Sequence, residues 1–192
     1  MNIKKFNEIA NSPRPYRALL AQDIEEWKMY LEFVQGYFEN RGIIKPVVVE
    51  IGIMHNAQKP FYEHLLNAEH IGIDINPNSA PDILDDSHRP ETMQELHRLL
   101  CRRKIDLLFI DGNHSYESVK QDYDLYAPLT EHIVAFHDIC ATVNSDVQRF
   151  WQELSRANGY MAIAFNRCNT SVSVADNKFI DMGIGLIIKE ST

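Results

Sequence analysis

The sequence predicts a doubly wound α/β fold, in which helices cover both faces of a mostly parallel sheet. Residues 105–110 and 133–136 form two apolar runs with the length of buried strands, and the segment between them has helical spacing. A strand, a crossover helix and a second strand make a parallel βαβ unit. The carboxyl ends of such strands meet at one edge of the sheet, where α/β proteins bind ligands. The ionisable residues that follow the two runs are Asp111, His114, His137 and Asp138.

Upstream of this unit, helical and strand-like segments alternate along the chain. Apolar residues recur at helical spacing from Tyr16 to about Asn40, and Gly42 stands where a helix C-cap is expected. Pro90 begins another helix, because proline is tolerated in a first turn. The elements expected here are a helix over 16–40, a strand over 47–52, a short helix over 61–66, a strand over 71–74 and a helix over 90–100.

Downstream, we expect a helix over 145–157 and strands over 160–165 and 183–189. The last two strands leave little room for a crossover helix, which suggests a closing hairpin with one antiparallel strand. The chain has 192 residues, enough for a single well-buried domain. We divide it into an N-terminal helical segment, residues 1–45, packed on an α/β domain, residues 46–192.

Composition excludes several classes of function. The formal net charge of −8 argues against nucleic acid as a partner, because phosphate binding favours a basic surface. No apolar run is long enough to span a membrane, and the first residues lack the apolar core of a signal peptide, so we expect a cytoplasmic protein. The nucleophile-elbow, P-loop and G-x-G-x-x-G motifs do not occur.

Two strand ends favour a nucleoside-containing ligand. Glu50 and Gly52 close the strand over 47–52, and a glycine at that turn lets a ligand approach the backbone. Asp74 ends the next strand, where an acidic residue can bind ribose hydroxyls. Each has a structural alternative: the glycine could serve packing, and Asp74 could cap the turn before Asn76. Taken together, they favour the ligand.

Three further residues are candidates for contact with that ligand. Asp86 and Ser87 follow the short apolar segment at 83–84 and would lie near its adenine, although they could instead cap the helix that Pro90 opens. His55 follows the glycine turn directly.

The acids and imidazoles after the two apolar runs can support metal and proton-transfer chemistry. Asp111 and Asp138 can hold a hard divalent cation through their oxygens, with His137 as a third ligand or a support at the edge. His114 can act as a general base near neutral pH. The structural alternative is a set of acids that cap loops at the strand ends.

Several segments resemble the class I S-adenosylmethionine-dependent methyltransferases. They resemble most closely the O-methyltransferases that act on sugars and other small molecules in natural-product pathways, and the related cephalosporin-hydroxylase-like proteins. The resemblance extends from about Val47 to Lys189. It is most specific at Asp111–Tyr116 and His137-Asp138. The segments that carry it are VVVEIGI, HIGIDINP, DLLFIDGNHSYESVKQDYDLYAPL, IVAFHDI and MGIGLIIK.

The resemblance implies a Rossmann-like sheet of seven strands with the last strand antiparallel. It also implies that S-adenosyl-L-methionine is the cofactor, with Mg²⁺ or another divalent cation in metal-dependent members. The methionine part would lie against Glu50 and Gly52, the ribose against Asp74 and the adenine near Asp86 and Ser87. Asp111, His137 and Asp138 map onto the metal ligands, with His137 in place of an acid, and His114 maps onto the general base.

One departure concerns the turn after Gly52. Residues 53–57 read Ile-Met-His-Asn-Ala where the family usually has further glycines. Asn56 can adopt a left-handed conformation and Ala57 is small, so the turn can still form.

The function expected from these residues is methyl transfer to a hydroxyl of a small-molecule acceptor, catalysed by Asp111 and His114. Two alternatives remain: a nucleoside-binding relative without catalysis, and an iron-dependent hydroxylase in which His114, His137 and one Asp form a facial triad. The N-terminal helix and the stretch 166–179 are expected to shape the acceptor pocket or a dimer contact, so a homo-oligomer is one expectation.

Overall fold

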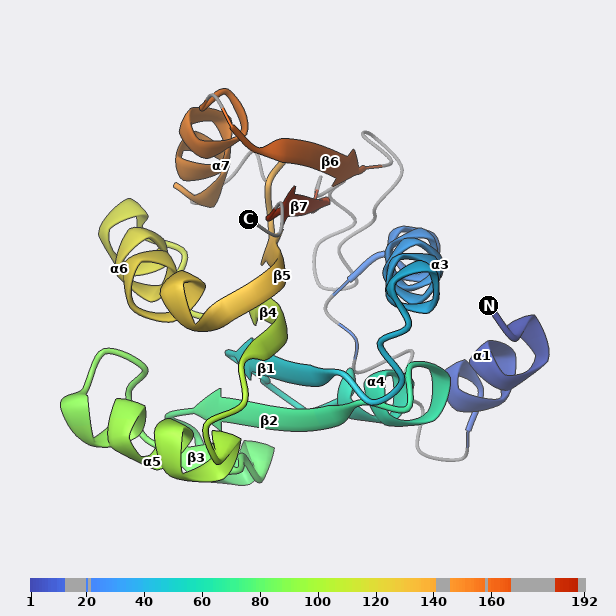
Figure 1. Ribbon diagram of the computed structural model, residues 1–192, viewed down its shortest axis with the longest axis horizontal. Coiled ribbons are helices and arrows are strands. Elements are labelled where there is room, and N and C mark those ends of the chain that lie inside the picture. Colours follow the sequence, from blue (N-terminus) through green and yellow to red (C-terminus); the bar gives the residue numbers. More distant parts are fainter. Residues whose placement is uncertain (13–19, 21, 141–145, 158, 167–181, 190–192) are drawn as a thin grey trace, which may run out of the picture.

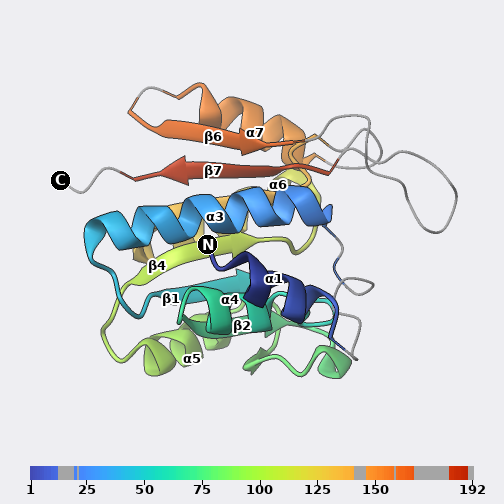
Figure 2. The ribbon, with the colours of Figure 1, turned by 90° about the vertical axis from the view of Figure 1, so that its right-hand side faces the viewer.

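The computed structural model describes residues 1–12, 20, 22–140, 146–157, 159–166 and 182–189, in which helices and strands alternate around one sheet (Figures 1 and 2). The strands are β1 (Val47–Ile51), β2 (Glu69–Asp74), β3 (Ile83–Leu84), β4 (Ile105–Ile110), β5 (Thr130–His137), β6 (Met161–Phe165) and β7 (Ile184–Ile188). The helices are α1 (Ile3–Ala10), α3 (Ile24–Arg41), α4 (Lys59–Leu65), α5 (Pro90–Leu100), α6 (Tyr116–Tyr126) and α7 (Val147–Ser155), with 3₁₀ turns η1 (Pro77–Ser79) and η2 (Ala127–Leu129).

The strands form a seven-stranded sheet in the order β3-β2-β1-β4-β5-β7-β6. Strand β7 runs antiparallel to both of its neighbours, β5 and β6, whereas the pairs from β3 to β5 are parallel. The predicted α/β class, the βαβ unit and the closing antiparallel strand are therefore confirmed. Among the described helices, none has the length and apolar character needed to cross a membrane.

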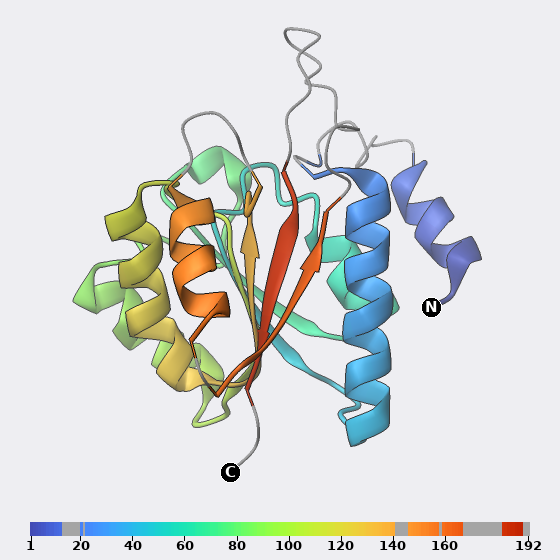
Figure 3. The same cartoon turned by 90° about the horizontal axis from the view of Figure 1, so that it is seen from above.

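Helices cover both faces of the sheet, as the view in Figure 3 shows. Buried residues of α1, α3 and α4 share one apolar cluster with alternate residues of the central strands. Buried residues of α5, α6 and α7 share a second cluster with the other face. This two-sided burial explains why the central strands read as continuous apolar runs in the sequence.

The helix expected over 16–40 is shorter at its start. Residues 13–19 and 21 lie outside the described part of the chain, and Leu20 and Gln22 are not helical. The helix begins at Ile24 because the side chain of Asp23 accepts hydrogen bonds from the backbone N–H groups of the first turn. Its other end follows the prediction, since Gly42 is a left-handed C-cap.

Other differences are small or lie outside the described residues. Helix α1 is additional to the expected helices, and α7 is shorter than the expected 145–157. The predicted pocket or dimer role of 166–179 falls almost entirely on residues outside the described part of the chain.

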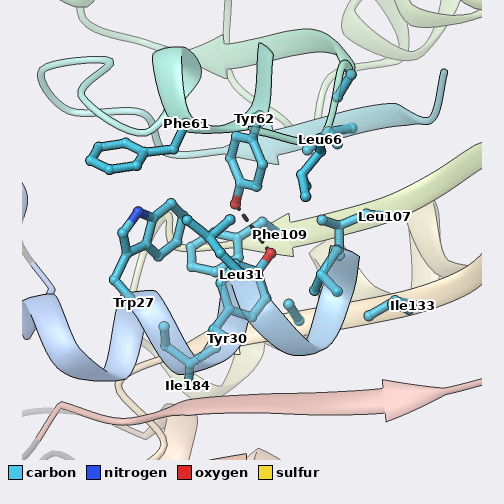
Figure 4. Close-up of a cluster of buried hydrophobic side chains, with 14 of the residues drawn as sticks. Trp27, Tyr30, Leu31, Phe61, Tyr62, Leu66, Leu107, Phe109, Ile133 and Ile184 are labelled. Atoms are coloured by element: carbon cyan, nitrogen blue, oxygen red, sulfur yellow. Dashed lines mark hydrogen bonds between the residues drawn. The ribbon is translucent and has the colours of Figure 1, made fainter. Parts of the chain in front are cut away.

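An aromatic cluster fixes α3 and α4 against the sheet (Figure 4). Trp27 is fully buried, and its ring makes edge contacts with Phe61, Tyr62 and Phe109 at 5.5 to 6.0 Å between centroids. The hydroxyl groups of Tyr30 and Tyr62 lie 3.2 Å apart and satisfy each other inside this apolar layer. The cluster therefore joins two helices and strand β4 through one side chain.

A buried acid and imidazole lie beneath the same layer. Glu50 and His70 are on the neighbouring strands β1 and β2, and Glu50 Oε2 is 2.7 Å from His70 Nε2. Both side chains are fully buried. Glu50 Oε1 and His70 Nδ1 have no hydrogen-bond partner among the described residues. Burial raises the pKa of the Glu50 carboxyl, and the hydrogen bond with His70 only partly offsets this rise.

Replacing Trp27 by alanine should remove the side chain that joins α3, α4 and β4. We expect the Trp27→Ala variant to lose about 3–5 kcal/mol of unfolding free energy, because a large cavity is left in a packed core. Urea denaturation followed by circular dichroism measures this loss. Met29→Ala, at a position of the same helix that is 37% exposed, should lose much less, and equal losses would contradict this account of the core.

The Glu50→Gln variant should be more stable than the wild type at neutral and higher pH. A raised pKa in the folded state means that the stabilising effect of the Glu50 proton is complete below the unfolded pKa and is lost as pH rises through the folded pKa. Glutamine is neutral throughout, so the advantage of the variant should grow as pH rises, to about 1 kcal/mol at pH 8.

Thermal unfolding between pH 4 and pH 8 checks this expectation, with the exposed Glu63→Gln as the control. If the variant lost as much stability as the wild type when the pH rises, Glu50 would not be the group that causes the pH dependence.

Candidate functional site

Strand register aligns the ends of β1, β4 and β5 at one edge of the sheet. Ile51 pairs with Ile110, and Ile110 pairs with Phe136. The residues that come next in each strand, Gly52, Asp111 and His137, therefore lie in one row. The polar residues that follow the two apolar runs in the sequence lie at this edge of the sheet.

Asp111 is the centre of an acid–imidazole cluster in this row. His137 Nδ1 lies 3.1 Å from Asp111 Oδ1 and 3.5 Å from Asp138 Oδ1. His114 lies on the other side, with Nδ1 3.2 Å from Asp138 Oδ2 and Nε2 3.7 Å from Asp111 Oδ1. Two carboxylates and two imidazoles therefore meet at one point, as the sequence predicts.

Burial differs among the four groups. The Asp111 and Asp138 side chains are 10% and 13% exposed and that of His137 is 4% exposed, whereas that of His114 is 41% exposed. His137 Nε2 has no hydrogen-bond partner among the described residues. His114 is therefore the member of the cluster that solvent or a small molecule can reach.

Opposite charges set the ionisation of the cluster. Burial alone would raise the pKa of Asp111, but the imidazoles of His137 and His114 hold that pKa below its usual value. Burial lowers the pKa of His137, yet the negative charge of Asp111 outweighs it and brings the pKa to about 9. The hydrogen bond with Asp111 raises the pKa of His114, and burial raises the pKa of Asp138.

Three of these residues have the geometry of a metal site. One ligand atom each from Asp111, His114 and Asp138 lies within 4.8 Å of the other two. Two carboxylates and one imidazole are a donor set that a divalent cation accepts. The sequence predicts His137 as the third ligand, whereas this group contains His114, and His137 stands beside it. The donor set fits a divalent cation.

Three buried polar side chains, those of Gln22, Gln58 and Glu26, lie on the α3 side of the cluster. No sequence motif singles them out. Gln22 Nε2 donates to Asp111 Oδ2 over 3.1 Å, and Gln58 Nε2 donates to Gln22 Oε1 over 3.4 Å. Glu26, in the first turn of α3, is 1% exposed and accepts a hydrogen bond from Gly183 N–H over 3.1 Å. Gln22 lies just before the helix cap, where hydrophobic periodicity gives no signal.

The turn after β1 depends on Gly52. Its φ is +80°, and a Cβ atom there would lie 2.2 Å from the carbonyl oxygen of Asp111. Met54 and Asn56 also have positive φ, of 46° and 54°. The expected left-handed conformation of Asn56 is therefore confirmed, and the turn forms without the additional glycines.

Asp74 caps the turn before Asn76, which is the structural alternative considered for it, and its contact with a ribose stays a prediction. Its Oδ2 accepts hydrogen bonds from the N–H groups of Ile53 and Met54, each over 3.0 Å, and its Oδ1 accepts one from Asn76 N–H over 2.8 Å. It thus caps its own turn and holds the glycine turn. Because a carboxylate oxygen can accept about two hydrogen bonds, Oδ1 can accept one more, from a ligand hydroxyl.

Apolar side chains surround Asp74 on the surface. Met54, Ile75 and Leu84 are 54%, 73% and 55% exposed. Ile75 follows Asp74 in the chain, Leu84 pairs with it across the sheet edge, and Met54 binds its carboxylate. A polar acceptor among exposed apolar groups suits a ligand with a flat, weakly polar ring.

The loop before α5 holds Ser87 more firmly than Asp86. The Ser87 hydroxyl donates to the buried Asp122 over 2.7 Å, and Tyr126 donates to the Ser87 carbonyl oxygen over 2.7 Å. The Asp86 side chain is 56% exposed and accepts from His88 N–H. The N-cap of α5 is Arg89, without a side-chain cap, so the alternative of a capping cluster is wrong.

The remaining predicted contacts lie at different depths. His55 is exposed in the turn after Gly52. Glu50 is fully buried against His70, so its contact with a cofactor stays a prediction.

Comparisons with known proteins match one segment of the chain to a family model and show proteins of similar fold. Residues 56–139 match a family model described as a methyltransferase domain. A search of curated proteins found no match. The fold is similar to that of the O-methyltransferase from Bacillus cereus, solved in complex with SAH, at a TM-score of 0.57 and 15% identity over 97% of this chain and 91% of that chain.

Two further solved structures are similar. The O-methyltransferase TomG from Streptomyces achromogenes, involved in tomaymycin synthesis and solved with SAM, gives a TM-score of 0.56 at 12% identity over 97% of this chain and 90% of that chain. The MycE methyltransferase from the mycinamycin biosynthetic pathway, solved with Mg, SAH and mycinamycin VI, gives 0.58 at 12% identity over 97% and 55%. Residues 56–139 therefore match a methyltransferase domain model, and the chain shares the fold of these solved O-methyltransferases.

Proposed function

We propose that this protein transfers a methyl group from S-adenosylmethionine to a hydroxyl of a small molecule, assisted by a divalent cation. One observation carries the proposal: the Gly52 turn held by Asp74 and the acid–imidazole cluster at Asp111 lie side by side at one sheet edge. A nucleoside site and a proton-transfer site are thus adjacent. The methyltransferase domain and the O-methyltransferases of similar fold agree with this chemistry.

The reaction needs positioning and the removal of one proton. The acceptor oxygen attacks the methyl carbon, the carbon–sulfur bond breaks, and its electron pair stays on sulfur to give S-adenosylhomocysteine. Asp111 and Asp138 would hold a divalent cation, whose positive charge would make the acceptor hydroxyl more acidic. Although His114 lies in the convergent donor set, in this mechanism it does not bind the cation and instead receives the hydroxyl proton, because its imidazole is the accessible basic group of the cluster. His137 is buried and holds the Asp111 and Asp138 carboxylates in place.

Asp74 would bind the cofactor through the ribose. Its Oδ1 retains capacity for one hydroxyl donor, and the exposed side chains of Met54, Ile75 and Leu84 offer apolar surface for the adenine. Asp86 and Ser87 would lie at the far end of the base. The acceptor we propose is a small molecule such as a sugar, which reaches the cluster from the side of His114.

The hydroxylase alternative is less well supported by the donor set. An iron facial triad has two imidazoles and one carboxylate, whereas the convergent group here has two carboxylates and one imidazole. That alternative also assigns no role to the turn held by Asp74.

Calorimetric titration with S-adenosylhomocysteine tests cofactor binding directly. We expect the wild type to bind and Asp74→Asn to bind about 10-fold or more weakly. The asparagine oxygen can still accept from the N–H groups of Ile53 and Met54, but its NH₂ group at the Oδ1 position can accept neither the Asn76 N–H nor a ribose hydroxyl. Asp124→Ala, an exposed carboxylate on α6, should bind as the wild type does. A wild type that does not bind would overturn the proposed function.

The role of His114 can be measured by methyl transfer from radiolabelled S-adenosylmethionine to a panel of monosaccharides, nucleosides and phenols. For any acceptor that the wild type methylates, we expect His114→Ala to lower kcat by about 10²–10⁴-fold, because the proton acceptor is lost. His97→Ala, an exposed imidazole on α5, should retain full activity. Turnover by His114→Ala at the wild-type rate would remove His114 from the mechanism.

A further inference from the structure

Two buried amides form a directed hydrogen-bond chain that ends on the central carboxylate. Gln58 is 3% exposed and donates to Gln22 Oε1, and Gln22 is 7% exposed and donates to Asp111 Oδ2. A buried amide is costly unless its polar atoms are paired. The carboxylate can only accept, so the NH₂ end of Gln22 must face Asp111. This contact fixes the orientation of the Gln22 amide, and with it the direction of the hydrogen bond from Gln58.

The two oxygens of Asp111 consequently face different partners. Oδ2 faces Gln22 at 3.1 Å, whereas Oδ1 faces His137 Nδ1 at 3.1 Å and His114 Nε2 at 3.7 Å. With Oδ2 engaged by a neutral donor, Asp111 presents Oδ1 to the imidazoles. The carboxylate therefore has one structural oxygen and one oxygen that faces the site.

These two hydrogen bonds also connect parts of the molecule that are distant in sequence. Gln22 precedes the cap of α3, and Gln58 is the N-cap residue of α4 and follows the turn that begins at Gly52. A shift of Gln58 or Gln22, caused by movement of the turn or of α3, would therefore alter the hydrogen bond that Asp111 accepts.

We propose that Gln22 is a positioning residue that binds Oδ2 of Asp111 and thereby directs Oδ1 toward His114, His137 and a bound cation. This inference rests on the proposed function for its catalytic meaning. Groups that orient a metal-binding or catalytic side chain commonly affect metal affinity by about 10–100-fold, although they do not touch the metal themselves. Gln58 supports Gln22 by satisfying its carbonyl oxygen.

The first test is the ¹⁵N spectrum of the histidine rings in metal-free protein labelled with ¹⁵N-histidine. We expect Gln22→Leu and Gln22→Met to shift the ring resonances of His137 and His114, because Asp111 is no longer held through Oδ2. Gln58→Leu should shift the same resonances less. The control is Gln121→Leu, an exposed glutamine on α6, which should leave them unchanged.

The second test is Mn²⁺ binding measured by electron paramagnetic resonance. We expect Gln22→Leu and Gln22→Met to weaken Mn²⁺ binding about 10-fold or more, while the affinity for S-adenosylhomocysteine changes less than about twofold. Folded Gln22 variants with wild-type histidine resonances and wild-type Mn²⁺ affinity would overturn the inference.

Failure of the proposed function is recognised separately. A wild type that binds neither Mn²⁺ nor S-adenosylhomocysteine contradicts the proposed function, whereas the histidine resonances of metal-free protein still decide whether Gln22 positions Asp111. The two Gln22 variants differ in shape, so a folding defect specific to one of them leaves the other as the test.

Discussion

The close approach between the ends of β1 and β4 is the constraint on which this site depends. Gly52 lies so near the backbone of Asp111 that any Cβ atom would overlap its carbonyl oxygen at 2.2 Å. This contact brings the turn after β1 next to the loop after β4, and Asp74 then holds the turn through two backbone N–H groups. The nucleoside side and the proton-transfer side of the proposed active site are adjacent because no side chain separates them.

The second organising feature is the pairing of opposite charges on the nearly buried side chains of Asp111 and His137. The carboxylate of Asp111 and the imidazole of His137 each stabilise the charged form of the other, which holds the pKa of the acid low and brings that of the imidazole to about 9. An unpaired charge at this depth would be costly, so the acids and imidazoles require one another. His114 differs because it is half-exposed, so a small molecule can reach this imidazole but not that of His137.

Much of this arrangement can be predicted from sequence for a simple reason. Central parallel strands are buried on both faces, so they appear as apolar runs, and the polar residues that follow them mark the ligand edge. Asp111, Asp74 and Gly52 are recognisable on that basis. Gln22 and Glu26 are not, because they reach the same edge from the segment before α3 and from its first turn, and no local pattern marks a residue that contacts a site 89 positions away. Apolar spacing predicts a start of α3 that is too early, because the cap at Asp23 fixes the first helical residue.

The α/β class, the parallel core with its antiparallel closing strand, and the edge where acids and imidazoles gather can all be predicted from the sequence, since they follow from hydrophobic periodicity and the direction of parallel strands. The contacts that each side chain makes at that edge are visible only in the folded chain. In the structure, His114 rather than His137 belongs to the convergent donor set, and Asp74 accepts hydrogen bonds that hold the turn. Glu50 is buried against His70, and Gln22 donates to Asp111. These contacts depend on distances between residues far apart in the chain, which packing of the helices on the sheet sets and local sequence does not encode.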